Sequence, residues 1–177
     1  NFALLLAQKA TTPALTVTCS DVELNCASAD ITATLLNAAA YRMVKKNASS
    51  ARQVASALRE KAREFGTTVK CARNSLQDGL PIFLAEDFTS RAHGFERIAR
   101  RLENALDTFT VSLLGAGNDA TGLGTDPGFT QAVCTQLSDL TGVPFTFDSD
   151  PMDGLNAVDT PLFAHGLLKS LAVHYWK

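Results

Sequence analysis

The most constraining feature of this 177-residue sequence is an apolar repeat that runs without interruption from residue 88 to residue 113. Apolar side chains recur in alternating steps of four and three, the spacing that places them along one side of an α-helix. We therefore predict a single helix over residues 84–114, about 45 Å long at a rise of 1.5 Å per residue and longer than any other except the last. A stripe of that length is not buried within a compact chain of this size, so we expect it to pack against other copies. The members of the repeat are Phe88, Ala92, Phe95, Ala99, Leu102, Leu106, Phe109 and Leu113.

Helical patterns also account for most of the remaining sequence. The final segment is apolar on more than one side, which predicts burial in the middle of a bundle. No segment alternates convincingly enough to predict a strand. The expected fold class is therefore all-α, a long-helix bundle that forms a single helical domain over residues 1–177. The other expected helices cover residues 2–10, Asp30 to about Lys46, a second segment capped by Asn47 and ended by Gly66, a helix opened by Asp126 and Pro127 and ended by Gly142, and about Asp153 to Trp176.

Composition and charge exclude several classes of protein. A net charge of -2 gives no electrostatic reason to expect nucleic acid or an anionic membrane as a partner. No apolar run approaches the roughly 18 residues that cross a bilayer. The apolar opening at residues 2–7 has no basic stretch before it and no small-residue cleavage site after it, so a signal peptide is not expected. We expect a cytoplasmic protein.

Cysteine, histidine and glycine positions show no metal or phosphate motif. The four cysteines form no Cys-x-x-Cys pair, and the three histidines are scattered along the chain. We expect free thiols in a reducing cytoplasm, no metal and no cofactor. The glycine-rich stretch at residues 115–124 lacks the Gly-Lys-Ser/Thr ending of a phosphate loop, so it is expected to be a turn between helices.

Several separate segments resemble the fumarase/aspartase superfamily, in the same order along the chain. Residues 73–82, Arg-Asn-Ser-Leu-Gln-Asp-Gly-Leu-Pro-Ile, resemble its segment Gly-Arg-Thr-His-Leu-Gln-Asp-Ala-x-Pro, in which aspartases carry Gln in place of His. Residues 121–129 resemble its turn Gly-Thr-Gly-Leu-Asn-Thr-x-Pro-x-Phe. Four further segments match its Asn-x-Asn-Glu-Val helix, its Ser-Ser-Asn-Asp segment, its Leu-Thr-Gly-x-Pro-Phe linker and its Ala-His-Gly-Ala-Leu-Lys-x-Leu-Ala-Val helix: residues 1–10, 27–30, 140–145 and 164–173.

The resemblance implies both an assembly and a chemistry. It implies a central domain of long, nearly parallel helices that assembles as a homotetramer around an intersubunit helical bundle. It also implies reversible elimination of water or an amine from a C4 dicarboxylate, giving fumarate. By position in the matched motifs, Ser28 and Asn74 would bind substrate and Ser75 would be catalytic. Helix N-termini suit this reaction, because their N–H groups stabilise the negative charge that develops on a carboxylate.

The positions that carry chemistry in the family depart from its pattern. The Ser-Ser-Asn of the family reads Ala27-Ser28-Ala29, and its Thr-His reads Asn74-Ser75. An unassisted serine hydroxyl does not titrate near neutral pH, so Ser75 is not equivalent to a histidine.

Two further departures concern the turn and the ends of the chain. The Asn of the family's turn is replaced by Gly124, and the Glu expected near the start is absent, with Leu4 or its neighbour in its place. The family's mobile Gly-Ser-Ser-x-Met-Pro loop, source of the catalytic Ser and a substrate-binding Lys, would lie beyond Lys177. With no initiator Met, the chain is expected to be truncated at both ends.

Three interpretations therefore remain open at this point. The chain is a piece of a working lyase whose other catalytic groups lie outside it, or a catalytically silent relative that keeps the fold and assembly. A third interpretation is a helical interaction module with only an architectural resemblance. For single residues the structural alternative is also open: Ser28 and Asn74 as helix caps, and Ser75 as a loop residue. On each interpretation we expect the chain by itself to be inactive.

Overall fold

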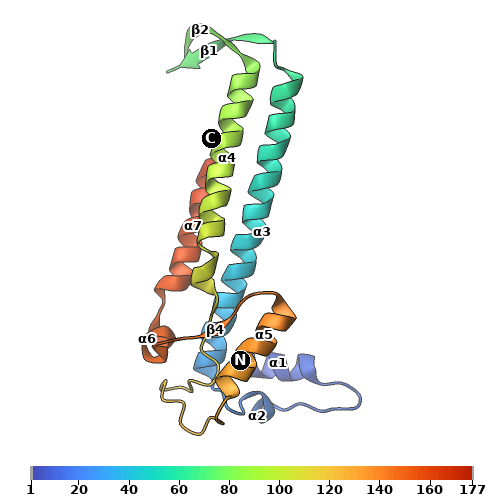
Figure 1. Cartoon of the computed structure of the whole chain (residues 1–177), viewed down its shortest axis with the longest axis vertical. Helices are drawn as coiled ribbons and strands as arrows, with labels where there is room; N and C mark the ends of the chain where they lie inside the picture. Colours follow the sequence, from blue (N-terminus) through green and yellow to red (C-terminus); the bar gives the residue numbers. More distant parts are fainter. Residues whose placement is uncertain (1, 177) are drawn as a thin grey trace. The chain divides into compact units, whose positions relative to one another are not determined.

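The structure, a computed structural model, describes residues 2–176 and is predominantly helical (Figure 1), which confirms the all-α class and the long helices. Asn1 and Lys177, at the two ends of the resemblance, lie outside the described residues. The helices are α1 (Phe2–Ala10), α2 (Cys19–Val22), α3 (Ser28–Glu64), α4 (Leu84–Asn104), the 3-10 helix η1 (Leu106–Phe109), α5 (Phe129–Thr141), α6 (Pro151–Asn156) and α7 (Asp159–Trp176). The strands are β1 (Val69–Asn74), β2 (Gln77–Phe83), β3 (Val111–Ser112) and β4 (Thr146–Phe147).

The chain divides into two compact units. The first unit comprises residues 1–42 and 107–164, and the second unit comprises residues 43–106 and 165–177. Helices α3 and α7 contribute to both. The single helical domain over residues 1–177 stays a prediction. No helix in the described part of the chain is long and apolar enough to cross a membrane.

Helix α3 is the longest element, with 37 residues, so the expectation that residues 84–114 would form a longer helix is wrong. The predicted break at Asn47 is also wrong. No Gly or Pro occurs between Ser28 and Glu64, so nothing in the sequence ends the helix. The Asn47 side chain caps no helix, and its Nδ2 donates to the Met43 carbonyl oxygen one turn back, at 2.8 Å.

Helix α4 ends at Asn104, ten residues before the predicted end at residue 114. The residues that follow include Thr108, Thr110 and Val111, whose β-branched side chains disfavour a helix. They form η1 and then β3, which pairs in parallel with β4. Phe109 and Leu113 are buried as the apolar repeat predicts, but from a 3-10 turn and an extended segment.

The expectation of no strand is wrong as well. Strands β1 and β2 form an antiparallel hairpin in the second unit, with Asn74 opposite Gln77. The two residues of the turn, Ser75 and Leu76, have φ angles of 52° and 63°. A type I′ turn requires positive φ at both central positions, which is why Asn and Gly are its usual residues. The sequence gives no such signal here.

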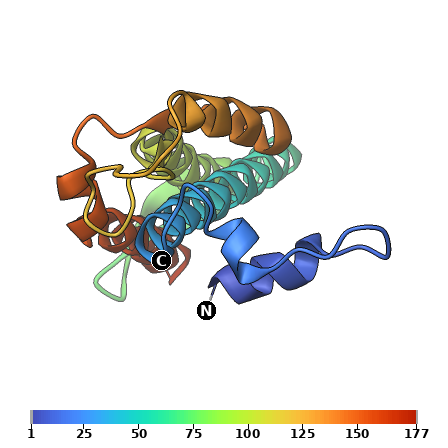
Figure 2. The same ribbon diagram turned by 90° about the horizontal axis from the view of Figure 1, so that it is seen from below.

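Helices α3 and α4 pack antiparallel in the second unit, side by side in both views (Figures 1 and 2). Small residues form most of the contact, which lets the two backbones approach closely. Arg52 pairs with Glu103 and Arg59 pairs with Glu96, so each helix advances seven residues between the two ion pairs. This spacing fixes the antiparallel register. The buried residues that α3 and α4 contribute are Val44, Ala48, Ala51, Ala55, Ala62, Ala92, Gly94, Phe95, Ile98, Ala99 and Leu102.

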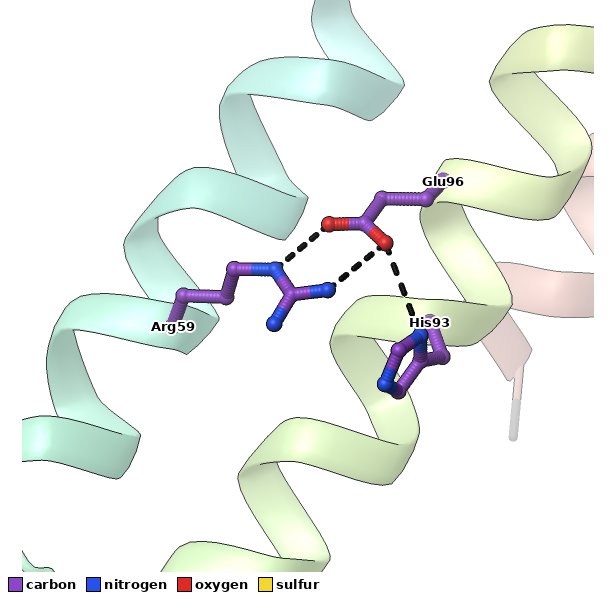
Figure 3. A network of polar contacts seen from close by, with 3 residues as sticks. All are labelled: Arg59, His93 and Glu96. Atoms are coloured by element: carbon purple, nitrogen blue, oxygen red, sulfur yellow. Dashed lines mark hydrogen bonds and ion pairs between the residues drawn. The ribbon is translucent and has the colours of Figure 1, made fainter.

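Figure 3 shows the second of these ion pairs. The Arg59 guanidinium donates from Nε to Glu96 Oε1 at 2.5 Å and from Nη2 to Oε2 at 2.8 Å. His93 Nδ1 lies 3.6 Å from the same Oε2. The hydrogen bonds from Arg59 lower the pKa of Glu96 below its usual value. Both partners remain partly exposed, so the pair orients the helices more than it stabilises them.

A polar stripe on α3 organises the first unit. Asp30, Thr34 and Asn37 lie one turn apart on one face of the helix and are buried. Asp30 Oδ2 accepts from the N–H groups of Gly115 and Gly117 at 3.2 and 3.0 Å, and its Oδ1 accepts from the Ala27 N–H at 2.9 Å. The Thr34 hydroxyl accepts from the Leu113 N–H, and Asn37 Nδ2 donates to the Val111 carbonyl. The stripe thus satisfies the backbone of the extended segment at residues 111–117, the start of the loop drawn in yellow in Figure 2.

Two predicted helix starts are displaced. Helix α5 begins at Phe129 with Gly128 as its N-cap at φ 85°, whereas the predicted cap, Asp126, accepts at its carboxylate from Asn25 Nδ2. The last predicted helix is split into α6 and α7, with α6 capped by Asp150. The burial predicted for the last helix is not found within the single chain, because several large apolar side chains of α7 are exposed: Leu162, Phe163, Val173, Tyr175 and Trp176.

Candidate functional site

The first unit contains a cavity of about 630 Å³ beside the N-terminal end of α3. Its walls are the first turns of α3, the segment at residues 108–118 and the junction of α6 with α7. The volume lies within the range of small-molecule sites. One wall is a helix N-terminus, whose partial positive charge favours anions.

Ser28 stands at this wall, as the first residue of α3. Its hydroxyl donates to Glu23 Oε1 at 3.3 Å, and its side chain is exposed. The two neighbouring positions, Ala27 and Ala29, have no polar side chain, and the Ala27 N–H is already bound by Asp30. The Ser28 hydroxyl is therefore the polar side chain that this stretch offers to a ligand.

The charge that lines the cavity is negative. Asp148, Asp153 and Asp159 are among its lining residues, which include no lysine, arginine or histidine. The first unit as a whole has 11 Asp and Glu residues against 2 Lys and Arg residues. Like charges repel more strongly where water is partly excluded. The cavity by itself is therefore unsuited to a dicarboxylate, and cations from elsewhere are needed before a dianion binds there.

Asn74 and Ser75, the other two predicted site residues, lie in the second unit. They sit at the tip of the β1–β2 hairpin, and both are exposed. The Ser75 hydroxyl donates to Asn74 Oδ1 at 3.3 Å, and no base among residues 2–176 is recorded next to it. Neither residue lines the cavity beside Ser28.

Gly124, which replaces the Asn of the family's turn, has a φ of 85° and open space where a side chain would project. Asn tolerates this left-handed conformation better than most residues. The substitution therefore keeps the shape of the turn and removes one carboxamide.

Sequence reasoning missed the carboxylates at the cavity. No motif singles out Asp148, Asp153 or Asp159, because aspartate is frequent in loops and at helix starts. The acidic composition of residues 107–164, which contain no lysine or arginine, was the signal that could have found them.

Two cysteines of the first unit, Cys26 and Cys134, are poor nucleophile candidates. Burial, and then the nearby charge of Asp30, raise the pKa of Cys26 to about 11. Burial also raises the pKa of Cys134. Both thiols are therefore protonated near neutral pH and unreactive. Within residues 2–176, no three His, Cys, Asp or Glu side chains are grouped so that they could hold a metal ion.

Comparison with known sequences gives a consistent picture. The sequence pattern of a family described as lyase matches residues 7–177. The chain is 33% identical to a fumarate hydratase class II of Chromobacterium violaceum over 158 residues, which are 89% of this chain and 34% of that protein. It is 30% identical to a fumarate hydratase class II of Ralstonia nicotianae over the same shares of both chains. The chain thus spans about a third of the length of these curated relatives.

Solved structures share the fold. The class II fumarase of Schistosoma mansoni superimposes with a TM-score of 0.79 at 21% identity, over 97% of this chain and 39% of that one. A fumarate lyase:delta crystallin from Brucella melitensis, solved bound to cobalt, gives a TM-score of 0.80 at 23% identity, over 88% of this chain and 34% of that one. Fold and family pattern together define a lyase scaffold. The chain belongs to the fumarase/aspartase superfamily.

Proposed function

We propose that this chain is the central helical part of a fumarate-forming lyase, which eliminates water or ammonia reversibly from a C4 dicarboxylate. The observation that carries the proposal is the family match over residues 7–177, together with relatives named fumarate hydratase class II. We propose further that the chain does not catalyse this reaction by itself, and that it acts in the cytoplasm.

Ser28 and Asn74 are the proposed substrate-binding residues, and Ser75 is the proposed catalytic one. Removal of a proton beside a carboxylate builds negative charge on that carboxylate, so aimed donors stabilise the transition state. The Ser28 hydroxyl at the start of α3 becomes such a donor when it turns from Glu23 to the substrate. Asn74 and Ser75 lie on an exposed hairpin tip, where a neighbouring copy can reach them.

A homotetramer is the proposed assembly. The first unit has 2 Lys and Arg residues against 11 Asp and Glu, whereas the second unit has 14 against 7. Units of opposite charge on different copies attract each other, and the second unit of one copy supplies cations that the cavity of another lacks. Exposed apolar side chains on α7, including Phe163 and Trp176, support burial between copies. Light scattering of the purified chain should give four times the chain mass, and a stable monomer at micromolar concentration would contradict the assembly.

Inactivity of the isolated chain follows from lost polar groups. Relative to the family, positions 27, 29, 75 and 124 have each lost a polar or titratable side chain. One lost donor to a developing oxyanion typically removes about 3 kcal/mol of transition-state stabilisation, or roughly a hundredfold in rate. Several such losses leave little of a normal lyase rate even though they add poorly.

The test incubates the purified chain with malate, and separately with fumarate plus ammonia, while ultraviolet absorbance reports fumarate. The fumarate hydratase of Chromobacterium violaceum is the positive control. No turnover above the blank is expected. Turnover within a hundredfold of that control would show that Ser28, Asn74 and Ser75 form a working site in the chain alone.

A catalytically silent relative is the second candidate function, favoured by the loss of polar side chains at Ala27 and Ala29 and by the anionic cavity. The same assay on the full reading frame that contains this sequence separates the two. Fumarate formation that is lost in Ser28→Ala supports the lyase. A folded tetramer without activity supports the silent relative.

A further inference from the structure

The second unit contains a cavity whose charge is opposite to that of the first. It encloses about 380 Å³ between α3, α4 and α7. Two arginines, Arg91 and Arg97, line it together with the polar side chains of Ser90, His174 and Tyr175, and no Asp or Glu is among its lining residues. The unit around it has 14 Lys and Arg residues against 7 Asp and Glu. A cavity of this kind attracts anions.

Arg97 is the side chain best able to bind an anion there. Its guanidinium is exposed and has no ion pair or hydrogen bond with any of residues 2–176. Arg52 and Arg59, by contrast, each bind a glutamate in two places. The five N–H donors of Arg97 therefore remain for a ligand, in the fork that matches a carboxylate or phosphate.

Gly94 places the histidine of this cavity. A Cβ at Gly94 would lie 2.5 Å from His174 Cε1 and 2.6 Å from its Nε2, so only glycine admits the imidazole against α4. Glycine is unfavourable inside a helix, and here the close approach of the ring explains its presence. The ring also meets Phe95 edge-on, with centroids 4.7 Å apart at 79°.

An apolar wall completes the cavity. Val54 and Leu58 from α3 and Phe95 from α4 also line it, and the ring of Tyr175 lies 4.9 Å from that of Phe95. Inorganic phosphate alone would leave this wall exposed to water. We propose that the cavity binds an oxyanion, carboxylate or phosphate, attached to a small apolar group such as an aromatic ring, a site separate from the proposed lyase site beside Ser28.

The test is calorimetric titration of the purified chain with phenyl phosphate, benzoate and inorganic phosphate at low salt. Comparison of phenyl phosphate with benzoate shows which oxyanion is preferred. The variant Arg97→Gln removes the proposed contact. Arg100→Gln is the matched control, because Arg100 is exposed on the same helix, carries the same charge and does not line this cavity. The NMR signal of His174 Cε1–H, assigned by its loss in His174→Gln, reports whether the ligand reaches the cavity.

Saturable binding of phenyl phosphate or benzoate is expected, at least tenfold tighter than inorganic phosphate and with a shift of the His174 signal. Arg97→Gln should weaken it at least tenfold, and Arg100→Gln by less than twofold. Equal losses of affinity in the two variants would mean that the general positive charge of α4, and not Arg97, attracts the ligand, and would overturn the site. Absence of saturable binding at millimolar concentration would also overturn it. Equal affinity for inorganic phosphate would refute the role of the apolar wall.

Discussion

The two units of the chain differ in charge and in what they bury. The first unit has a large excess of acidic residues and the second a large excess of basic ones. All four buried polar residues that the structure describes, Asp30, Thr34, Asn37 and Ser112, belong to the first unit. The buried side chains described in the second unit are all apolar. The buried polar residues and the excess of acidic residues therefore both belong to the first unit, whereas the second unit combines an apolar interior with an excess of basic residues.

Backbone hydrogen bonding explains the difference in the interiors. Helices satisfy most of their own N–H and C=O groups, so the helices of the second unit can pack through apolar residues alone, most of them alanine. The first unit packs an extended segment at residues 111–117 against a helix, and that segment needs partners. Asp30, Thr34 and Asn37 supply them. An interior with irregular backbone requires polar side chains in its core.

The largest expected effect is in the second unit, from Leu102→Asp. Leu102 is 1% exposed in the packed seam of α4. A carboxylate there has no partner, so we expect a loss of at least about 4 kcal/mol in the free energy of unfolding. Urea unfolding followed by circular dichroism measures it. Arg100→Asp, at an exposed position of the same helix, is the control and should change stability little.

Asp30→Ala tests the first unit. A carboxylate introduced at Leu102 destabilises the second unit, whereas the native buried carboxylate of Asp30 stabilises the first. Its removal leaves the N–H groups of Ala27, Gly115 and Gly117 without their acceptor. We expect a loss of about 3 kcal/mol, measured by the same urea titration. Asp119→Ala, at an exposed carboxylate in the same unit, is the control. A loss as small as that of Asp119→Ala would show that the polar stripe does not hold the extended segment.

Much of the fold was predictable from sequence, and the errors concern where helices and strands begin and end. The apolar repeat correctly identified six buried residues, whereas its member Leu106 is only half-buried: Ala92, Phe95, Ala99, Leu102, Phe109 and Leu113 are the six. Apolar spacing alone does not report where a helix ends. The alanine-rich stretch around Asn47 was divided because Asn is a common cap, although no breaker stands there. The hairpin was missed because its turn uses Ser75 and Leu76 at positive φ, where no typical turn residue gives the signal.

The candidate site was predictable only in part. Ser28, found through the resemblance, lines the cavity of the first unit. Asn74 and Ser75 lie on an exposed hairpin tip, where no base or acid among residues 2–176 of their own unit is hydrogen-bonded to Ser75. Their roles stay predictions.

Thiol reactivity gives a third comparison of the units. Burial and the charge of Asp30 raise the pKa of Cys26 to about 11, so its thiol stays protonated at pH 8. Cys71 in the second unit is exposed on the hairpin. We expect iodoacetamide at pH 8 to alkylate Cys71 at least tenfold faster than Cys26, as measured by peptide mass spectrometry. Comparable rates would mean that the first unit opens readily. In Asp30→Asn, alkylation of Cys26 should accelerate, because the charge that raises its pKa is removed.

The smallest expected effect concerns the surface ion pairs of the second unit. Hydrogen bonds from Arg59 and Arg52 lower the pKa values of Glu96 and Glu103. A carboxyl group whose pKa is lower in the folded than in the unfolded chain stabilises the fold above its ordinary pKa, here 4.5, and loses this contribution as the pH falls through its folded-state pKa.

Arg59→Met should therefore lower the melting temperature at pH 7 by at most about 2 °C, because both partners are partly exposed. The difference between variant and parent should narrow as the pH falls through the lowered pKa of Glu96 and the carboxylate takes up a proton. It should also shrink in 1 M salt, which screens exposed pairs. Lys61→Met, which removes an exposed pair within α3 alone, is the matched control. If Arg59→Met instead cost as much as Leu102→Asp, the second unit would depend on its charged surface as strongly as on its apolar core, and the contrast with the first unit would fail.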